Sequence, residues 1–186
     1  IYIRTGYHTG QIMVCLVLNA RSQKQSGITS PQWNLLVDNF TKINGMTSIC
    51  LNFNPENTNV ILGKKTSTLW GEDAIEDTIG GIRYRISPQS FYPVNPVQTE
   101  KLYRTALEFA DIKPGETVWD LYCGIGTISL FIAKELGSAG EVIGVEIVPE
   151  AIRVRNEAIP HQTHTLLRHM PTLQIYLRFH PSFFHP

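Results

Sequence analysis

The strongest constraint on the fold of this chain is a glycine turn between an apolar strand and a helix. Residues 117–121 form a short apolar run, residues 123–126 read Cys-Gly-Ile-Gly, and an apolar helical segment follows at residues 127–136. A second apolar run comes next, at residues 142–145. Strand, turn, helix and strand in this order predict the beginning of a doubly wound α/β sheet, with both strands parallel and buried.

Two acidic residues stand at the ends of the predicted strands. Asp120 ends the first strand, and Glu146 ends the second, 22 positions after Gly124. The ends of parallel strands meet at one crevice, where ligands of such folds bind, and a carboxylate there can accept two hydrogen bonds from ribose hydroxyls. Gly124 and Gly126 allow the backbone to approach that ligand closely.

A nicotinamide or flavin dinucleotide is the competing ligand. Its G-x-G-x-x-G fingerprint uses a third glycine for close packing of the helix on the strand, and the equivalent position here is Ser129. Asp120, four residues before the first glycine, suits a ligand without a pyrophosphate. We therefore expect S-adenosylmethionine, and the remaining interpretation is a glycine turn that binds nothing.

Three regions along the 186 residues differ in pattern. Residues 1–90 predict an α+β domain with a hairpin, a helix and further strands. The hairpin is expected at residues 2–4 and 11–18, the helix at 31–43, and the strands at 47–53, 60–62, 67–70 and 81–86. Residues 91–160 alternate helix and strand and end with a helix over 149–160. Residues 161–186, rich in His and Pro and without an acidic residue, predict no further strand and are interpreted as a disordered or frameshifted tail.

The helix predicted up to residue 110 has clear starting signals. Asn95 is a suitable cap, Pro96 fits the first turn, and Gln98 occupies the capping-box position. The predicted apolar face of this helix carries Leu102, Ala106 and Phe109.

Composition limits the possible functions. Sixteen Lys and Arg residues balance sixteen Asp and Glu residues, so charge alone gives no support for nucleic-acid binding. Cys15, Cys50 and Cys123 are scattered, which favours a reduced, cytoplasmic location over a disulfide framework. No run approaches the ~20 apolar residues of a membrane-spanning helix.

Because the chain starts at Ile1 without a methionine or a signal-peptide pattern, we expect it to begin inside a longer protein.

Three successive segments resemble motifs of the uracil-5-methyltransferases of ribosomal and transfer RNA. They are residues 90–103, which begin Ser-Phe-Tyr-Pro-Val-Asn-Pro, residues 118–127, which include Asp-Leu-Tyr-Cys-Gly-Ile-Gly, and residues 144–152, which begin Gly-Val-Glu-Ile-Val-Pro. The resemblance extends over about residues 1–157. It implies an RNA substrate, S-adenosylmethionine as methyl donor, and an incomplete doubly wound, Rossmann-like methyltransferase domain preceded by a small α+β domain that contacts RNA.

The resemblance also implies that Tyr122 and Glu146 contact the donor. The strand and glycine-turn pattern adds Asp120, Gly124 and Gly126 to the expected donor site. Within this set, the carboxylate of Glu146 is expected to bind the ribose. Position 93 departs from the family, which usually has a glutamine there, in an F-x-Q-V-N motif. Pro93 cannot make the contact of that glutamine with the donor, which predicts weaker donor affinity.

The reaction of this family needs a cysteine thiolate that adds to carbon 6 of uracil and a base that removes the proton from carbon 5. In the family the cysteine follows a D-P-P-R segment and the base is a later glutamate, and this sequence contains neither segment. Cys123 is interpreted as a small packing residue, because no neighbour in the sequence would favour its thiolate form. No catalytic residue is therefore named in this chain.

The expected function is methyl transfer to carbon 5 of a uridine in RNA, in a chain that lacks the nucleophile. The alternatives are a catalytically inactive fragment that binds donor or RNA, and a methyltransferase that acts on another substrate. Product analysis separates them, because only the first predicts 5-methyluridine.

Three weaker signals complete the pattern. His161, His164 and His169 do not predict a metal site, because their segment has no periodicity that would fix ligands. Arg83 and Arg85 alternate with apolar residues and are interpreted as a solvated strand face, with contact to RNA phosphate as the alternative. An unfinished parallel sheet exposes an edge and an apolar face, which predicts marginal stability or self-association.

Overall fold

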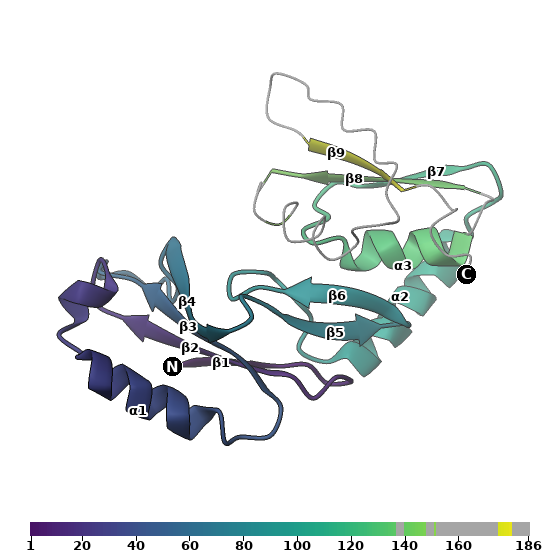
Figure 1. Cartoon of the computed structure of the whole chain (residues 1–186). Coiled ribbons are helices and arrows are strands. Elements are labelled where there is room, and N and C mark those ends of the chain that lie inside the picture. Colours follow the sequence, from purple (N-terminus) through teal and green to yellow (C-terminus); the bar gives the residue numbers. More distant parts are fainter. Residues whose placement is uncertain (137–139, 148–150, 152–174, 180–186) are drawn as a thin grey trace. The chain divides into compact units, whose positions relative to one another are not determined.

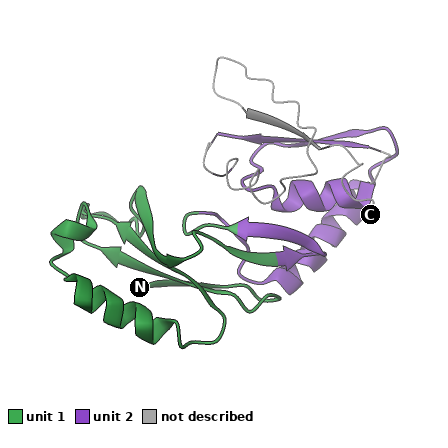
Figure 2. Ribbon diagram, in the orientation of Figure 1, with its two compact units in different colours: residues 1–77, 86–89 green, residues 78–85, 90–186 purple. Residues whose placement is uncertain are grey.

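The computed structural model describes residues 1–136, 140–147, 151 and 175–179, and the chain forms two compact units (Figures 1 and 2). Unit 1 comprises Ile1–Asp77 and Ile86–Gln89, and unit 2 comprises Thr78–Arg85 and Ser90–Pro186. The division passes through the hairpin formed by β5 (Ile75–Ile79) and β6 (Ile82–Ile86). Each unit has its own sheet and its own apolar cluster.

Unit 1 is built on a four-stranded sheet in the order β1-β2-β3-β4. The strands are β1 (Tyr2–Thr5), β2 (Ile12–Leu18), β3 (Met46–Phe53) and β4 (Lys65–Gly71). β1 and β2 form the predicted antiparallel hairpin, and β4 is antiparallel to β3. β2 and β3 are parallel, and such a pair needs a crossover connection, which here contains the short helix η1 (Gln23–Ser26) and the helix α1 (Ser30–Phe40).

Helix α1 confirms the helix predicted in the first region. Its entry is fixed by the Gln32 side chain, whose Oε1 accepts the N–H of Thr29 at 2.8 Å. Trp33 on this helix is 4% exposed and packs with Leu51 and Phe53 of β3. The helix therefore supplies the apolar cover for one face of the sheet.

Residues 60–62 are not a strand, so that prediction is wrong. They lie in the loop that joins β3 to β4. The Asn54 side chain donates through Nδ2 to the carbonyl oxygens of Val60 (2.7 Å) and Ile61 (3.1 Å). These carbonyl groups are thus satisfied by a side chain instead of a neighbouring strand, which no apolar pattern reveals.

Unit 2 confirms the predicted strand, turn, helix and strand. β7 (Thr117–Asp120) is parallel to β8 (Glu141–Glu146), and α3 (Thr127–Leu136) connects them. A third strand, β9 (Ile175–Phe179), pairs antiparallel with β8, which the sequence pattern did not predict. The prediction of no further strand after residue 160 is therefore wrong. The five residues Ile-Tyr-Leu-Arg-Phe do not show the apolar–polar alternation that signals a strand. The helix predicted over 149–160 lies outside the described residues, apart from residue 151.

Helix α2 (Pro96–Ala110) begins as predicted, because Oδ1 of the cap Asn95 accepts the Gln98 N–H at 3.1 Å. Its predicted apolar face is wrong. Leu102 is 65% exposed and Phe109 is 86% exposed. The helix instead packs through Tyr103 and Leu107 against the apolar cluster of unit 2.

The two parallel strands of unit 2 differ in burial. On β8, Val142 and Val145 are buried as expected. On and after β7, Trp119 is 53% exposed and Leu121 is 58% exposed, so the prediction of a buried first strand is wrong. Among the strands that the structure describes, β7 pairs only with β8 and is therefore an edge strand of this sheet.

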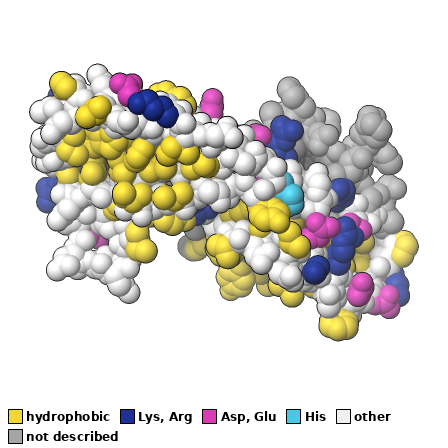
Figure 3. Space-filling model, turned by 90° about the horizontal axis from the view of Figure 1, so that it is seen from below, with side chains coloured by type: hydrophobic (Ala, Val, Ile, Leu, Met, Phe, Trp, Pro, Cys, Tyr) yellow, Lys and Arg dark blue, Asp and Glu magenta, His cyan; other side chains and the backbone are white. Residues whose placement is uncertain are grey.

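Apolar side chains also reach the surface of unit 1. Figure 3, seen from below, shows hydrophobic side chains gathered over one area of this unit, at the left. The large exposed hydrophobic residues of unit 1 include Ile3 and Leu35, at 59% and 64% exposure. Of the helices in the part of the chain described here, none has the length and the apolar character needed to cross a bilayer.

Candidate functional site

The predicted glycine turn lies between β7 and α3 and is tied to the neighbouring strand. The N–H of Cys123 donates to the carbonyl oxygen of Val145 on β8 at 3.0 Å, and the N–H of Gly126 donates to the carbonyl oxygen of Cys123 at 2.7 Å. Gly124 and Gly126 have φ angles of +55° and +82°, in the left-handed region that favours glycine. A Cβ added at Gly124 would meet no heavy atom of the protein within 4 Å, so within the chain itself it is the backbone conformation that favours glycine there.

The carboxylate of Glu146 lies on this turn. Its Oε2 accepts the N–H of Gly124 at 2.8 Å, although the two residues are 22 positions apart. The parallel pairing of β7 and β8 brings the two strand ends to the same edge of the sheet. A carboxylate can accept several hydrogen bonds, so the contact with Gly124 does not exhaust the acceptor capacity of Glu146.

Asp120 is held at the mouth of the turn by two donors. The hydroxyl of Ser129 donates to Oδ2 at 2.5 Å, and the N–H of Tyr122 lies 3.4 Å from Oδ1. Ser129 is fully buried in the first turns of α3. In the sequence, Ser129 was noted only because it replaces the third glycine of the G-x-G-x-x-G fingerprint. The role of its hydroxyl in orienting Asp120 was not predicted.

Two tyrosines fix the start of α3 at Thr127. The hydroxyl of Tyr84 on β6 donates to the Thr127 carbonyl oxygen at 3.0 Å, and the hydroxyls of Tyr103 and Thr127 are 2.9 Å apart. Burial raises the pKa of Tyr84 well above its ordinary value and also raises the pKa of Tyr103. Both phenols are therefore neutral at physiological pH and can act as donors. No sequence signal linked these tyrosines to the turn.

The structure brings together four of the five predicted donor-site residues: Asp120, Gly124, Gly126 and Glu146. Tyr122 belongs to the same turn, but its side chain is 90% exposed. Cys123 is 5% exposed and lies in the apolar cluster of unit 2, as expected for a packing residue. The turn is thus a preformed backbone cradle with two carboxylates and an exposed aromatic ring at its edge.

Two other predicted features are located by the structure. On β6 the side chain of Arg83 is exposed and those of Ile82 and Tyr84 are buried, so the predicted alternation is present. Within the described ranges no group of three or more His, Cys, Asp or Glu side chains could hold a metal ion. His161, His164 and His169 lie outside those ranges.

Comparison with known families and proteins identifies relatives of the chain. A family model described as a methyltransferase domain matches residues 112–165. A curated protein of Halalkalibacterium halodurans, named an uncharacterized RNA methyltransferase, is 52% identical over 150 residues, which are 80% of this chain and 31% of that protein. A Clostridium tetani protein of the same description is 47% identical over 153 residues, which are 82% of this chain and 31% of that protein. The chain thus spans about a third of the length of the curated relatives it matches.

A solved structure supports the fold. The Pyrococcus abyssi tRNA (uracil-54, C5)-methyltransferase, in complex with S-adenosyl-L-homocysteine, matches 85% of this chain and 35% of its own chain, with a TM-score of 0.61 and 24% identity. At this identity the match shows the fold, and it confirms the predicted Rossmann-like α/β class.

Proposed function

The chain is related in sequence to proteins named RNA methyltransferases, and on that premise we propose that it carries the S-adenosylmethionine site of an enzyme that methylates RNA. The proposed donor-binding residues are Asp120, Tyr122, Gly124, Gly126 and Glu146. The observation that carries this proposal is the hydrogen bond from the Gly124 N–H to Glu146, at 2.8 Å.

This hydrogen bond argues against a dinucleotide. In pyrophosphate sites the backbone N–H groups at the turn and at the helix N-terminus donate to phosphate oxygens. Here the Gly124 N–H already donates to a carboxylate, and the Asp120 carboxylate lies at the same turn. Two carboxylates repel a pyrophosphate, whereas the donor has no pyrophosphate and carries a cationic sulfonium. A carboxylate at the end of β8 is suited to accept from the ribose.

The substrate that we propose is a uridine of ribosomal or transfer RNA, methylated at carbon 5. The motif resemblance over residues 90–103, 118–127 and 144–152 supports this choice. The printed activity of the Pyrococcus abyssi neighbour, a tRNA uracil-C5 methyltransferase, agrees with it. We place the protein in the cytoplasm, in keeping with its three free cysteines.

A second candidate function is a chain that binds donor or RNA without catalysis. The D-P-P-R segment and its cysteine do not occur among these 186 residues, so the nucleophile of the first function is not named in this chain. Incubation with methyl-labelled donor and RNA, followed by nucleoside analysis, separates the two functions. 5-Methyluridine indicates the enzyme, and bound donor without product indicates the binding chain.

The donor site itself is tested by calorimetric titration with S-adenosylhomocysteine and, separately, with NAD. We expect saturable binding of the adenosyl ligand only. Glu146→Ala should weaken it roughly 10- to 100-fold, because hydrogen bonds to a charged group contribute about 1.5–3 kcal/mol. Glu108→Ala removes an exposed carboxylate from α2 and serves as the matched control. Equal binding of NAD, or no binding of either ligand, would contradict the proposal.

A further inference from the structure

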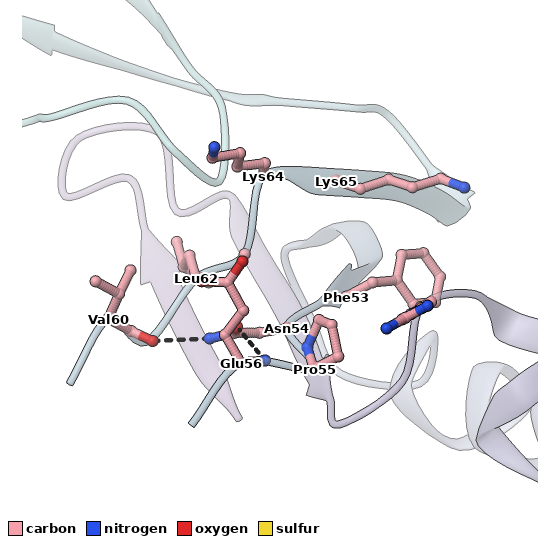
Figure 4. Close-up of a pocket in the computed structure, with 10 residues that line it drawn as sticks. Phe53, Asn54, Pro55, Glu56, Val60, Leu62, Lys64 and Lys65 are labelled. Carbon is pink, nitrogen blue, oxygen red and sulfur yellow. Dashed lines mark hydrogen bonds between the residues drawn. The ribbon is translucent and has the colours of Figure 1, made fainter. Parts of the chain in front are cut away.

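A pocket in unit 1 lies apart from the glycine turn in the sequence and has no assigned role. Its volume is ≈ 390 Å³, and it is formed at the end of β3, by the loop that leads to β4 and by Arg21 (Figure 4). This volume is at the small end of the roughly 300–1,000 Å³ that is typical of ligand pockets. It suits one nucleotide-sized group and is too small for a duplex.

The loop that lines the pocket is held in place by two asparagine side chains. Asn54 binds the Val60 carbonyl oxygen at 2.7 Å, which Figure 4 shows. Asn52, which is fully buried, donates to the carbonyl oxygen of Gly63 at 2.8 Å and accepts its N–H at 2.7 Å. A Cβ at Gly63 would lie 2.0 Å from the Phe53 carbonyl oxygen, so the loop packs directly on the strand end. The pocket is therefore preformed.

The lining of the pocket combines an apolar wall with a surplus of positive charge. The apolar residues that line it are Phe53, Pro55, Val60 and Leu62. Three cationic side chains, Arg21, Lys64 and Lys65, accompany a single carboxylate, Glu56. The Nζ atom of Lys65 lies 5.7 Å from the centre of the Phe53 ring, so charge and aromatic surface adjoin. The whole chain has no net charge, which makes this local surplus a distinct feature.

We propose that this pocket binds one unpaired nucleotide of the RNA substrate, with the base against the apolar wall and the phosphodiester at the lysines. Proteins recognise single-stranded RNA by this combination of apolar or aromatic contact with the base and cationic contact with the backbone. The proposal rests on the proposed RNA methyltransferase function. It adds a subsite in unit 1 to the donor site in unit 2.

The test compares two double variants that lose the same charge. Lys64→Ala/Lys65→Ala removes the lysines of the pocket, and Lys24→Ala/Lys42→Ala removes two lysines of unit 1 that do not line it. Fluorescence anisotropy of a labelled ten-nucleotide oligouridylate measures affinity at a series of KCl concentrations. We expect the pocket variant to bind about tenfold more weakly and to reduce the slope of log K against log salt by about 0.7, since the one phosphate contact that the lysines share contributes about 0.7 on a single strand.

Three outcomes would contradict the proposal that this pocket binds a nucleotide. They are equal weakening by both double variants, no binding of the oligonucleotide by the unmodified chain, and competition by inorganic phosphate as strong as that by uridine 5′-monophosphate. Titration of the pocket variant with S-adenosylhomocysteine separates this proposal from the donor site. If the pocket variant binds the donor analogue unchanged and RNA more weakly, the RNA subsite and the donor site are both supported. If no donor binding is observed, the proposed function is contradicted, and the anisotropy comparison alone decides whether the pocket binds RNA.

Discussion

β3 in unit 1 and β7 in unit 2 both combine apolar and polar residues, but they differ in burial. β3 pairs with β2 on one side and β4 on the other, and its last six residues are all buried. β7 pairs with β8 alone among the described strands, and the exposed residues of β7 alternate with half-buried ones. The comparison teaches that burial of an apolar strand depends on the strands beside it as much as on its own residues.

The two units also use buried polar groups for different purposes. In unit 1, Asp77 and Asn52 are fully buried and hold loops of the same unit. In unit 2, the buried hydroxyl of Ser129 and the half-buried carboxylate of Glu146 hold the glycine turn. The polar groups of unit 2 thus serve the proposed donor site.

The largest expected effect comes from a matched pair of leucines. Leu51→Ala on β3 should lower the free energy of unfolding by about 2–5 kcal/mol, because Leu51 is fully buried and its removal leaves a cavity. Leu121→Ala, at a residue that is 58% exposed, should change it by no more than about 0.5 kcal/mol. Urea denaturation followed by tryptophan fluorescence gives both values. Equal losses of unfolding free energy in the two variants would contradict the difference in burial between the two leucines.

The next effect concerns the buried carboxylate of unit 1. Asp77 accepts the N–H groups of Tyr7 (2.9 Å) and His8 (2.8 Å) at the turn between β1 and β2. Asp77→Ala should cost about 2–3 kcal/mol, because it leaves these donors without their acceptor. Asp77→Asn keeps one acceptor oxygen and should cost less. Thermal unfolding of the two variants checks the order, and a larger loss in the asparagine variant would refute the explanation.

A smaller effect is expected at alkaline pH in unit 2. Burial holds the pKa of Tyr84 well above its ordinary value of about 10, so the folded state keeps a proton that the unfolded state releases. The stability that this provides is complete below about pH 10 and is lost as the pH rises further. Tyr84→Phe should cost about 1 kcal/mol at pH 7, for the lost hydrogen bond to Thr127, and should make the alkaline decline shallower. Melting temperatures between pH 8 and 11 test this, and an unchanged decline would exclude Tyr84 as its source.

The smallest effect on stability is expected at the exposed strand of unit 2. Trp119→Ser should lower the free energy of unfolding by less than Leu51→Ala does, because the Trp119 side chain is 53% exposed. It should nevertheless reduce self-association if the apolar surface of β7 causes it. Sedimentation velocity of the parent chain and the variant at several concentrations measures this. A parent chain that is monomeric at all of them would remove the basis for self-association.

The sequence predicted the elements whose signals are local. The cap at Asn95, the hairpin of β1 and β2, and the glycine turn between β7 and α3 depend on neighbouring residues, and all are present. Asp120 and Glu146 were also correctly predicted to lie at one edge of the sheet, because each ends a strand and the ends of parallel strands meet there.

The sequence did not predict features that depend on distant partners. Helix α2 has two apolar stripes, and its buried side is selected by contacts such as that between the rings of Tyr103 and Phe131, 5.5 Å apart. Ser129 binds Asp120, and Asn54 binds residues 60–61, through side-chain hydrogen bonds. The hydrophobic periodicity of a sequence does not reveal such bonds. Burial of β7 was overestimated because it depends on distant elements that cover the faces of the sheet, and these are not encoded in the strand itself.

The central claim is that a preformed donor site lies at the ends of β7 and β8 in unit 2. Hydrogen–deuterium exchange with and without S-adenosylhomocysteine tests it most directly, because it locates the ligand along the chain. The account predicts slower exchange on ligand addition at residues 120–127 and at the end of β8, near Gly124 and Glu146, with unit 1 unchanged. Unchanged exchange at these residues, or protection confined to unit 1, would contradict it.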